Sequence, residues 1–340
     1  MGNEKDHLPT QFDFFQILTI RGSDYFTEKK TLFKSLEAGN YGEQKVMKYI
    51  QEYAPSHWTV LQNVWLRDFD RFECDLILLT SNQIYILEVK NYQGTLLYDN
   101  GQCFYNSHET SLNPFEQIRT NLINVKRMCS RVSTSIDVQA AIIFAGDDHE
   151  VIMKTPLENI RVLTSNGIRN FILDIVQQEK RGLNKRFDHE RLLRLFQSYE
   201  IDNPYQPVPL SEAEMKHIRP GIYCANCQSF NVQITKFKVI CSCGLHESRE
   251  EAIVRTICDY GVLTYGRTLK RKDLMAFFNG HVSHSYLISV CHKHFTVVNN
   301  GSYTCYVNNN LPYHNTILQF SGLKPRYYYH NNGDINILDK

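Results

Sequence analysis

The chain has 340 residues, with 37 Lys and Arg against 36 Asp and Glu, and 42% of its residues are hydrophobic. This is the ordinary composition of a globular protein, and the length suggests two or three domains. No apolar run approaches the roughly 18 residues that span a bilayer, and the first residues lack an export signal, so we expect no membrane association and a cytoplasmic location. Ten cysteines in such a chain are interpreted as thiols and metal ligands rather than as disulfides.

The first half of the chain alternates between helical and strand-like patterns. Residues up to about 37 show no clear period, and the apolar spacing then predicts a helix from Gly39 that Pro55 ends. Short apolar runs predict strands at 58–66, 74–79 and 83–89. A further strand and hairpin are expected over 96–105, around Asn100 and Gly101.

The pattern continues beyond Pro114, which opens a second predicted helix that runs to about residue 132. Strands are expected at 138–144 and 160–163, and another helix from about Ile168. The order of these elements indicates an α/β sheet covered by helices. Residues 181–195 are then predicted to form an exposed, charged amphipathic helix.

A linker divides the chain, because three prolines within residues 202–209 prevent both a helix and a central strand. The near-zero net charge hides an asymmetry across it. Residues 211–340 hold 14 Lys and Arg against 9 Asp and Glu, a balance of +5. The first 210 residues hold the other 23 basic and 27 acidic residues, a balance of −4. The basic second part is a hint that contact with an anionic partner lies there.

Acidic residues and a lysine are placed so that they can share one site. Glu88 and Lys90 are two residues apart on a predicted strand, so their side chains project to the same face. Asp75 starts the preceding strand, and a hairpin can bring it beside Glu88, while Glu43 on the first helix can point to the same place. Converging carboxylates bind Mg²⁺ or Mn²⁺.

The alternative interpretation is a solvated surface pair, which is what an exposed Glu-x-Lys on a strand usually is. Glu88, however, interrupts an otherwise apolar run. A buried charge needs a partner or a metal ion, and together with Asp75 this favours the metal site.

Four short motifs stand in order within a stretch from about residue 39 to 163. They are Gly42-Glu43-x-x-Val46, Glu73-Cys74-Asp75, Leu87-Glu88-Val89-Lys90-Asn91 and Asn113-Pro114-Phe115-Glu116-Gln117. As a set they resemble the nuclease-related domain family of the PD-(D/E)xK nuclease superfamily. Cys74 directly before the aspartate is a minor departure from the family's pattern.

The resemblance implies a restriction-endonuclease-like mixed sheet flanked by helices, and hydrolysis of a phosphodiester by water bound to Mg²⁺ or Mn²⁺. The implied metal ligands are Glu43, Asp75 and Glu88, with the Val89 carbonyl as a further ligand. Lys90 is implied to orient the water or to stabilise developing charge. Gln117, near the N-terminus of its helix, is implied to hydrogen-bond the water or a phosphate oxygen.

A second constellation lies in the cysteine-rich module after the linker. Cys224 and Cys227, then Cys241 and Cys243, form two close pairs that satisfy a four-coordinate structural Zn²⁺ site and resemble a zinc ribbon. Gly244 permits the tight turn of such a knuckle, and His246 is an alternative ligand. The other cysteines are expected to be core thiols: Cys74, Cys103, Cys129, Cys258, Cys291 and Cys305.

The last part of the chain resembles a winged helix in the order of its predicted elements. Helices are expected at 250–260, 272–278 and 283–292, followed by a hairpin over 295–307. The third helix would present base-reading residues to a DNA groove, and the basic run before it would hold phosphates. These candidate nucleic-acid contacts are Arg267, Lys270, Arg271, Lys272, Ser283, His284, Tyr286 and Lys293. The alternative is a small domain whose charged run is simply solvated.

The sequence as a whole therefore predicts a DNA nuclease that depends on Mg²⁺ or Mn²⁺, with a structural Zn²⁺ in an appended module. The expected domains are an N-terminal extension (1–38), a nuclease domain (39–200), a linker (201–210), a zinc ribbon (211–248) and a small α+β winged-helix-like domain (249–340). The rival hypothesis is a DNA-binding or scaffold protein whose nuclease-like fold is catalytically idle. A homodimer with one active site per DNA strand is left open.

Overall fold

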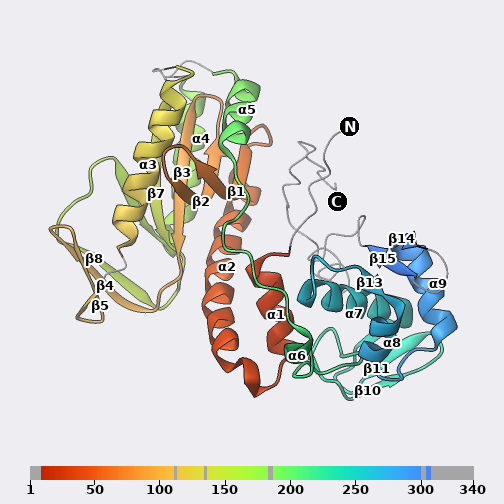
Figure 1. The fold of residues 1–340 in the computed structure, drawn as a ribbon. Coiled ribbons are helices and arrows are strands. Elements are labelled where there is room, and N and C mark those ends of the chain that lie inside the picture. Colours follow the sequence, from red (N-terminus) through yellow and green to blue (C-terminus); the bar gives the residue numbers. More distant parts are fainter. Residues whose placement is uncertain (1–8, 111–112, 134–135, 183–186, 300–303, 308–340) are drawn as a thin grey trace. The chain divides into compact units, whose positions relative to one another are not determined.

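The structure is a computed structural model that describes residues 9–110, 113–133, 136–182, 187–299 and 304–307. The chain forms two compact units, one of residues 36–204 and the other of residues 1–35 together with 205–340. Figure 1 shows the elements of both units, and the boundary near residue 35 falls within the long helix α2 (Thr27–Tyr53). Among the described residues, no helix is long and apolar enough to cross a membrane.

A five-stranded mixed sheet forms the centre of the 36–204 unit, with the strand order β1-β2-β3-β7-β9. Three antiparallel neighbours, β1 (Thr59–Arg67), β2 (Arg71–Leu79) and β3 (Gln83–Lys90), are joined by tight turns. The strands β7 (Asp137–Phe144) and β9 (Ile160–Thr164) run parallel to β3. The central strands β3 and β7 are nearly continuous apolar runs because both of their faces are covered.

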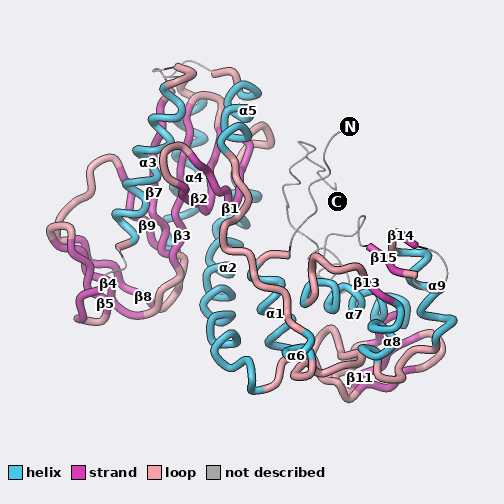
Figure 2. The backbone as a smooth tube through the Cα atoms, viewed as in Figure 1, coloured by secondary structure: helices cyan, strands magenta, loops and turns pink. Residues whose placement is uncertain are grey.

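Helices cover the two faces of this sheet, each over its own apolar cluster. On one face α2 and α4 (Ile168–Lys180) pack through residues such as Val46, Ile50 and Phe171. On the other face α3 (Pro114–Ser130) and α5 (His189–Tyr199) contribute Phe115, Leu122, Leu192 and Phe196. The predicted α/β sheet flanked by helices is confirmed, and Figure 2 shows the strands between the helices.

A second, smaller sheet in the same unit has the order β6-β5-β4-β8. It consists of β4 (Gly94–Asp99), β5 (Gln102–Tyr105), β6 (His108–Thr110) and β8 (His149–Met153). The β4–β5 turn has positive φ at both Asn100 (48°) and Gly101 (87°), as a two-residue hairpin turn of the primed type requires. The hairpin predicted at this position is confirmed.

Two local predictions are wrong. The segment before residue 37 is helical, because it contains α1 (Gln11–Arg21) and the short 3₁₀ helix η1 (Asp24–Phe26). It also contains the first turns of α2, which begins at Thr27 rather than at the predicted Gly39. Glycine in a helix interior costs about 1 kcal/mol, which a helix of 27 residues tolerates because tertiary packing supplies most of its stability.

The helix predicted over 181–195 also differs from the structure. α4 ends at Lys180, and α5 begins only after Asp188, whose side chain accepts a hydrogen bond from the Arg191 amide; residues 183–186 lie outside the described residues. Leu192 and Phe196 are buried against α3, so this helix is packed on the core rather than exposed. The charge of its outer face concealed the apolar stripe in the sequence.

The other unit joins the N-terminal helix to the second half of the chain. Its elements are α1, η1, α6 (Glu212–Met215), β10 (Val232–Ile234), β11 (Lys238–Cys241), β12 (His246–Ser248), α7 (Arg249–Leu263), β13 (Leu269–Lys270), α8 (Arg271–Phe278), α9 (His284–His294), β14 (Thr296–Asn299) and β15 (Cys305–Val307). The order of α7 to β15, three helices followed by a hairpin, is the predicted winged-helix order, with β13 completing a three-stranded sheet. The predicted boundaries at residues 38, 200, 210 and 248 stay predictions.

Residues 10–21 pack directly on α7. Phe14, Ile17 and Leu18 share a buried cluster with Val262 and Phe277. At the end of α1, the Arg21 side chain is wholly buried and its Nε lies 2.8 Å from Asp259 Oδ2. The N-terminal segment is thus part of the core of this unit.

Candidate active site and metal centre

The candidate site lies where β2 and β3 separate. Their antiparallel ladder runs from Leu79 opposite Ile84 to Leu76 opposite Leu87, and the next opposed residues are Asp75 and Glu88. There the Asp75 Oδ2 atom accepts a hydrogen bond of 2.7 Å from the Val89 amide. At this point the Asp75 carboxylate, rather than a backbone carbonyl of β2, accepts the hydrogen bond from the Val89 amide, and the β2–β3 ladder ends.

Glu88 and Lys90 point to the same side of β3, as predicted. The Glu88 side chain is wholly buried, and the Lys90 Nζ lies 2.6 Å from its Oε1. Lys90 also donates a 3.3 Å hydrogen bond to the Oε1 of Gln117. Gln117 is positioned by the start of α3, where the Asn113 side chain caps the helix and Pro114 occupies its first turn.

Glu43 is brought to the site by a close approach of α2 to the end of β3. A Cβ on Gly42 would lie 3.1 Å from the Cβ of Asn91 and 3.4 Å from Val89 Cγ1, so only glycine leaves the helix this close without displacing a neighbour. The Asn91 Nδ2 donates a 2.7 Å hydrogen bond to the carbonyl of Ala38 and fixes the approach. The five predicted catalytic residues therefore gather at one end of the sheet.

The carboxylates of the cluster hold their protons more tightly than usual. Burial, then the charge of Asp75, raises the pKa of both Glu43 and Glu88 to about 8, and burial also raises the pKa of Asp75. Burial lowers the pKa of Lys90, but the charges of Glu88 and Asp75 outweigh it and keep Lys90 protonated. When ionised, these carboxylates would carry more negative charge than one lysine can balance, and a divalent cation would relieve this excess.

Glu73 is a further acidic residue of the site to which the sequence analysis assigned no role. It lies two residues before Asp75 on β2, and burial, then the Asp75 charge, raises its pKa to about 7. The Asn121 side chain of α3 donates a 2.7 Å hydrogen bond to its carbonyl. The i, i+2 spacing of Glu73 and Asp75 was the available signal, since it is the same spacing that places Glu88 with Lys90.

The acidic residues interact electrostatically without converging on one point. Among the described residues, the only group of three or more Cys, His, Asp or Glu side chains with ligand atoms within 4.8 Å of one another is the set of four cysteines. The donor chemistry nevertheless suits Mg²⁺ or Mn²⁺, because the carboxylate oxygens are hard ligands. In addition, the buried Oε2 of Glu88 has no hydrogen-bond partner among the described residues. In their donor chemistry, though not in the spacing of their oxygens, these residues suit a divalent cation.

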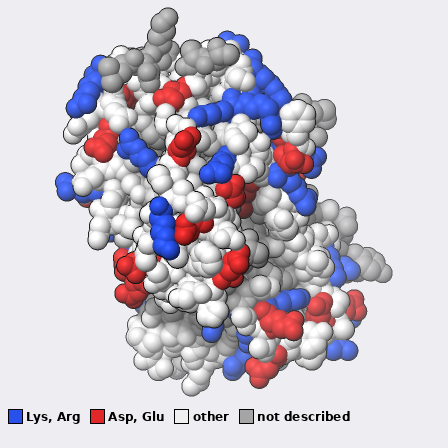
Figure 3. Space-filling view, turned by 90° about the vertical axis from the view of Figure 1, so that its left-hand side faces the viewer, with Lys and Arg blue, Asp and Glu red and all other residues white. Residues whose placement is uncertain are grey.

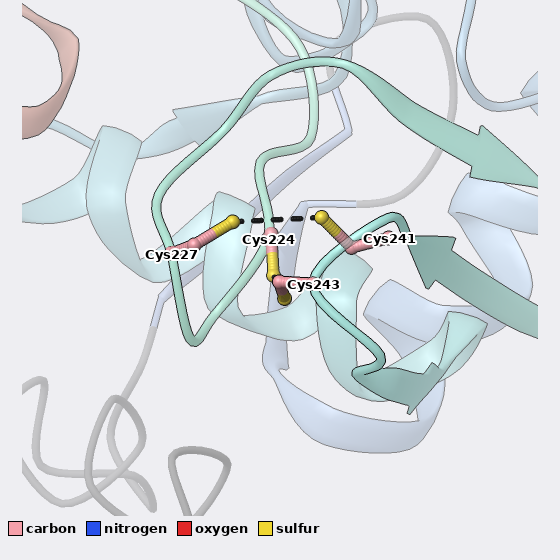
Figure 4. A group of neighbouring side chains, drawn as sticks. All are labelled: Cys224, Cys227, Cys241 and Cys243. Atoms are coloured by element: carbon pink, nitrogen blue, oxygen red, sulfur yellow. Dashed lines mark hydrogen bonds between the residues drawn. The ribbon is translucent and has the colours of Figure 1, made fainter.

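The four predicted cysteine ligands do converge. Figure 4 shows them turned toward one another from the loop before β10 and from the end of β11, with Sγ separations of 3.5 Å between Cys224 and Cys243 and between Cys227 and Cys241. Backbone and side-chain donors, led by the Leu245 amide, lower the pKa of Cys243 to about 6, which favours a thiolate ligand.

The cysteine cluster has the features expected of a zinc site. The predicted turn at Gly244 has a φ of 92°, and the alternative ligand His246 is not part of the group. Four thiols at this spacing form a set that can bind Zn²⁺ with tetrahedral geometry. The six other cysteines are buried, as predicted for core thiols: Cys74, Cys103, Cys129, Cys258, Cys291 and Cys305.

The predicted nucleic-acid contacts are divided between exposed and engaged side chains. Six are at least partly exposed: Arg267, Lys270, Arg271, Lys272, Ser283 and His284. Among the described residues, none of the basic side chains in this group forms an ion pair with an acidic residue. Lys293 lies 2.6 Å from Glu250, and the ring of Tyr286 lies 5.0 Å below the Arg249 guanidinium. On the face in Figure 3 the described basic and acidic side chains are interspersed, so charge alone marks no binding surface there.

One comparison with known proteins gives a match. The family model described as nuclease-related domain matches residues 38–145, about a third of the chain. A search of curated proteins and a search of solved structures each found no match. The matched segment contains all five residues predicted to be catalytic, from Glu43 to Gln117.

Proposed function

Because residues 38–145 carry a nuclease-related domain, we propose that this protein is a metal-dependent nuclease that hydrolyses phosphodiester bonds of DNA. The observation that carries the proposal is the cluster of carboxylates with raised pKa values around Lys90, at the open end of β2 and β3. Buried carboxylates of this kind are costly to the fold, and such groups gather where they serve chemistry.

The acidic residues would hold the metal. Glu43, Asp75 and Glu88 supply carboxylate oxygens, the Val89 carbonyl is a further proposed ligand, and Glu73 adds negative charge beside Asp75. A bound Mg²⁺ or Mn²⁺ would polarise the phosphodiester and activate water. A cation held by Glu88 would also compete with Lys90 for the same carboxylate, which is 2.6 Å from the ammonium group.

Lys90 and Gln117 would act on the phosphate. Burial lowers the pKa of Lys90, but the charges of Glu88 and Asp75 raise it further, so Lys90 is a cation in the metal-free site. Its role is then to stabilise the negative charge that develops on the phosphate oxygens. Gln117 positions the lysine through the hydrogen bond between Lys90 Nζ and Gln117 Oε1.

The second unit would bind the nucleic acid. The four cysteines would hold a structural Zn²⁺, since four protein ligands leave no open position for catalysis. Exposed basic residues before and within α8, such as Arg267, Lys270 and Lys272, are proposed to contact phosphates.

Cleavage assays on the full chain test the proposal. Linear, circular and single-stranded DNA are incubated with Mg²⁺, with Mn²⁺ or without a divalent ion, beside Glu88→Gln and the exposed control Glu158→Gln. We expect metal-dependent cutting that Glu88→Gln abolishes and Glu158→Gln preserves. If Glu88→Gln cuts as well as the natural chain, the assigned site is wrong. Binding without cutting under every condition would instead favour the idle DNA-binding protein.

A further inference from the structure

We infer that the β10–β11 turn and the start of α7 form a binding site for an unpaired nucleotide strand, with a phosphate between Lys236, Arg249 and His281 and a base stacked on Phe237. The inference rests on the proposed function for the class of ligand and specifies the form of the nucleic acid. None of these four residues was a candidate nucleic-acid contact in the sequence analysis.

A pocket of about 490 Å³ lies between β10 with the turn that follows it, the start of α7 and the loop after α8. Its walls include Val232 and Ile234 of β10, together with three side chains that carry N–H donors, Lys236, Arg249 and His281. None of the residues that line it is acidic. A pocket with several donors and no carboxylate suits an anion such as a phosphate group.

Arg249 is held in place but keeps an unused donor. Its guanidinium lies 5.0 Å from the centre of the Tyr286 ring, and its Nη2 donates a 3.3 Å hydrogen bond to the His281 carbonyl. The Arg249 Nε, although buried, has no hydrogen-bond partner among the described residues. A buried donor without a partner is costly, and a phosphate oxygen in the pocket would satisfy it.

His281 offers a second fixed donor. Its Nδ1 accepts a 3.0 Å hydrogen bond from the Ile222 amide, so in the neutral ring the proton must be on Nε2. Burial lowers the pKa of His281, which keeps the ring in this neutral form at physiological pH. Gly221, with a φ of 95°, makes room for the ring, because a Cβ there would lie 2.9 Å from its Cε1.

Phe237 extends the pocket with an aromatic surface. It is 72% exposed at the tip of the turn, its carbonyl accepts a 2.9 Å hydrogen bond from the Arg249 amide, and the Lys236 Nζ lies 5.2 Å from its ring centre. An exposed aromatic ring beside a cation is an arrangement on which bases of single strands stack. Duplex bases are already stacked on each other, so the site favours an unpaired strand.

The acidic residues near the start of α7 do not oppose this assignment. Glu250 is engaged by Lys293 at 2.6 Å and by His294 at 2.7 Å, and Glu251 does not line the pocket. Glu247 is buried in an ion pair with Arg255 at 2.8 Å.

Binding of labelled single-stranded and duplex DNA to the full chain, measured by fluorescence anisotropy without added divalent ion, tests the inference apart from hydrolysis. We expect Phe237→Ala to weaken single-strand binding about tenfold and to leave duplex binding unchanged. Lys236→Ala is expected to lower the slope of log K against log salt by about 0.7. The matched controls Val208→Ala and Lys216→Ala, both exposed in the same unit, should change neither quantity.

Two outcomes would overturn the inference. The first is that neither Phe237→Ala nor Lys236→Ala changes the affinity for single strands or the salt slope. Both side chains are exposed, so these substitutions should not disturb folding and obscure the result. The second is equal weakening of duplex and single-strand binding by Phe237→Ala, which would remove the base-stacking role. Neither outcome depends on whether the chain cuts DNA, so the proposed nuclease function is tested separately.

Discussion

Replacing Glu88 by glutamine should stabilise the metal-free 36–204 unit at alkaline pH. The Glu88 side chain is wholly buried, and burial, then the charge of Asp75, raises its pKa from 4.5 to about 8. Below about pH 4.5 the carboxyl group is protonated in both the folded and the unfolded chain, so it costs nothing. Between pH 4.5 and 8 the unfolded chain loses this proton first, and the free energy of unfolding therefore falls as the pH rises.

The magnitude follows from the two pKa values. At about 1.4 kcal/mol per pH unit, the interval from 4.5 to 8 corresponds to a cost of about 5 kcal/mol at pH 8 and above. Glutamine removes this cost, and the pKa of about 8 already includes the attraction between Glu88 and the Lys90 ammonium group at 2.6 Å. We expect Glu88→Gln to gain roughly 4–5 kcal/mol at pH 8 and to differ little from the natural chain at pH 4.5.

Urea unfolding followed by tryptophan fluorescence measures this change in the right part of the chain. The chain has two tryptophans, Trp58 and Trp65, and both lie in the 36–204 unit. The control Glu158→Gln should leave stability unchanged at both pH values. Excess Mg²⁺, at about 100 times its dissociation constant, should add about 2.7 kcal/mol to the natural chain and much less to Glu88→Gln. Equal destabilisation of Glu88→Gln at pH 4.5 and pH 8 would refute the reasoning and make Glu88 a purely structural ion-pair partner.

Three further changes test other parts of the structure. Gly42→Ala would place a Cβ 3.1 Å from the Cβ of Asn91, so we expect a loss of roughly 1–3 kcal/mol in urea unfolding and slower DNA cleavage, whereas Gly39→Ala, with no atom within 4 Å, should not slow cleavage. Cys243→Ser should lower the zinc content of the purified chain, measured by atomic absorption, and an unchanged content would rule out the four-cysteine site. Arg21→Met leaves Asp259 buried without its partner at 2.8 Å, and the expected loss of about 3–5 kcal/mol should make the second unit sensitive to limited proteolysis; full resistance would contradict the assigned ion pair.

Much of the sheet could be predicted from local patterns. The strands around Asp75 and Glu88, the turn at Asn100 and the helix start at Pro114 all depend on neighbours within a few residues. Alternation, turn chemistry and capping act over that range, so they can be inferred from the sequence directly. The four-cysteine cluster could likewise be predicted, because the short spacing within each cysteine pair and the turn at Gly244 are local features.

Contacts between distant segments decided the rest. Arg21 meets Asp259 across 238 residues, and no local pattern in α1 points to α7. The roles of Glu73 and Arg249 also depend on tertiary neighbours: Asp75 raises the pKa of the first, and Tyr286 lies under the guanidinium of the second. The sequence by itself therefore indicated which residues are able to carry chemistry, since residue type and short spacing set what each group can do. Only the tertiary structure decided which charges share a buried environment, because burial and close approach arise from the packing of elements that are far apart in the chain.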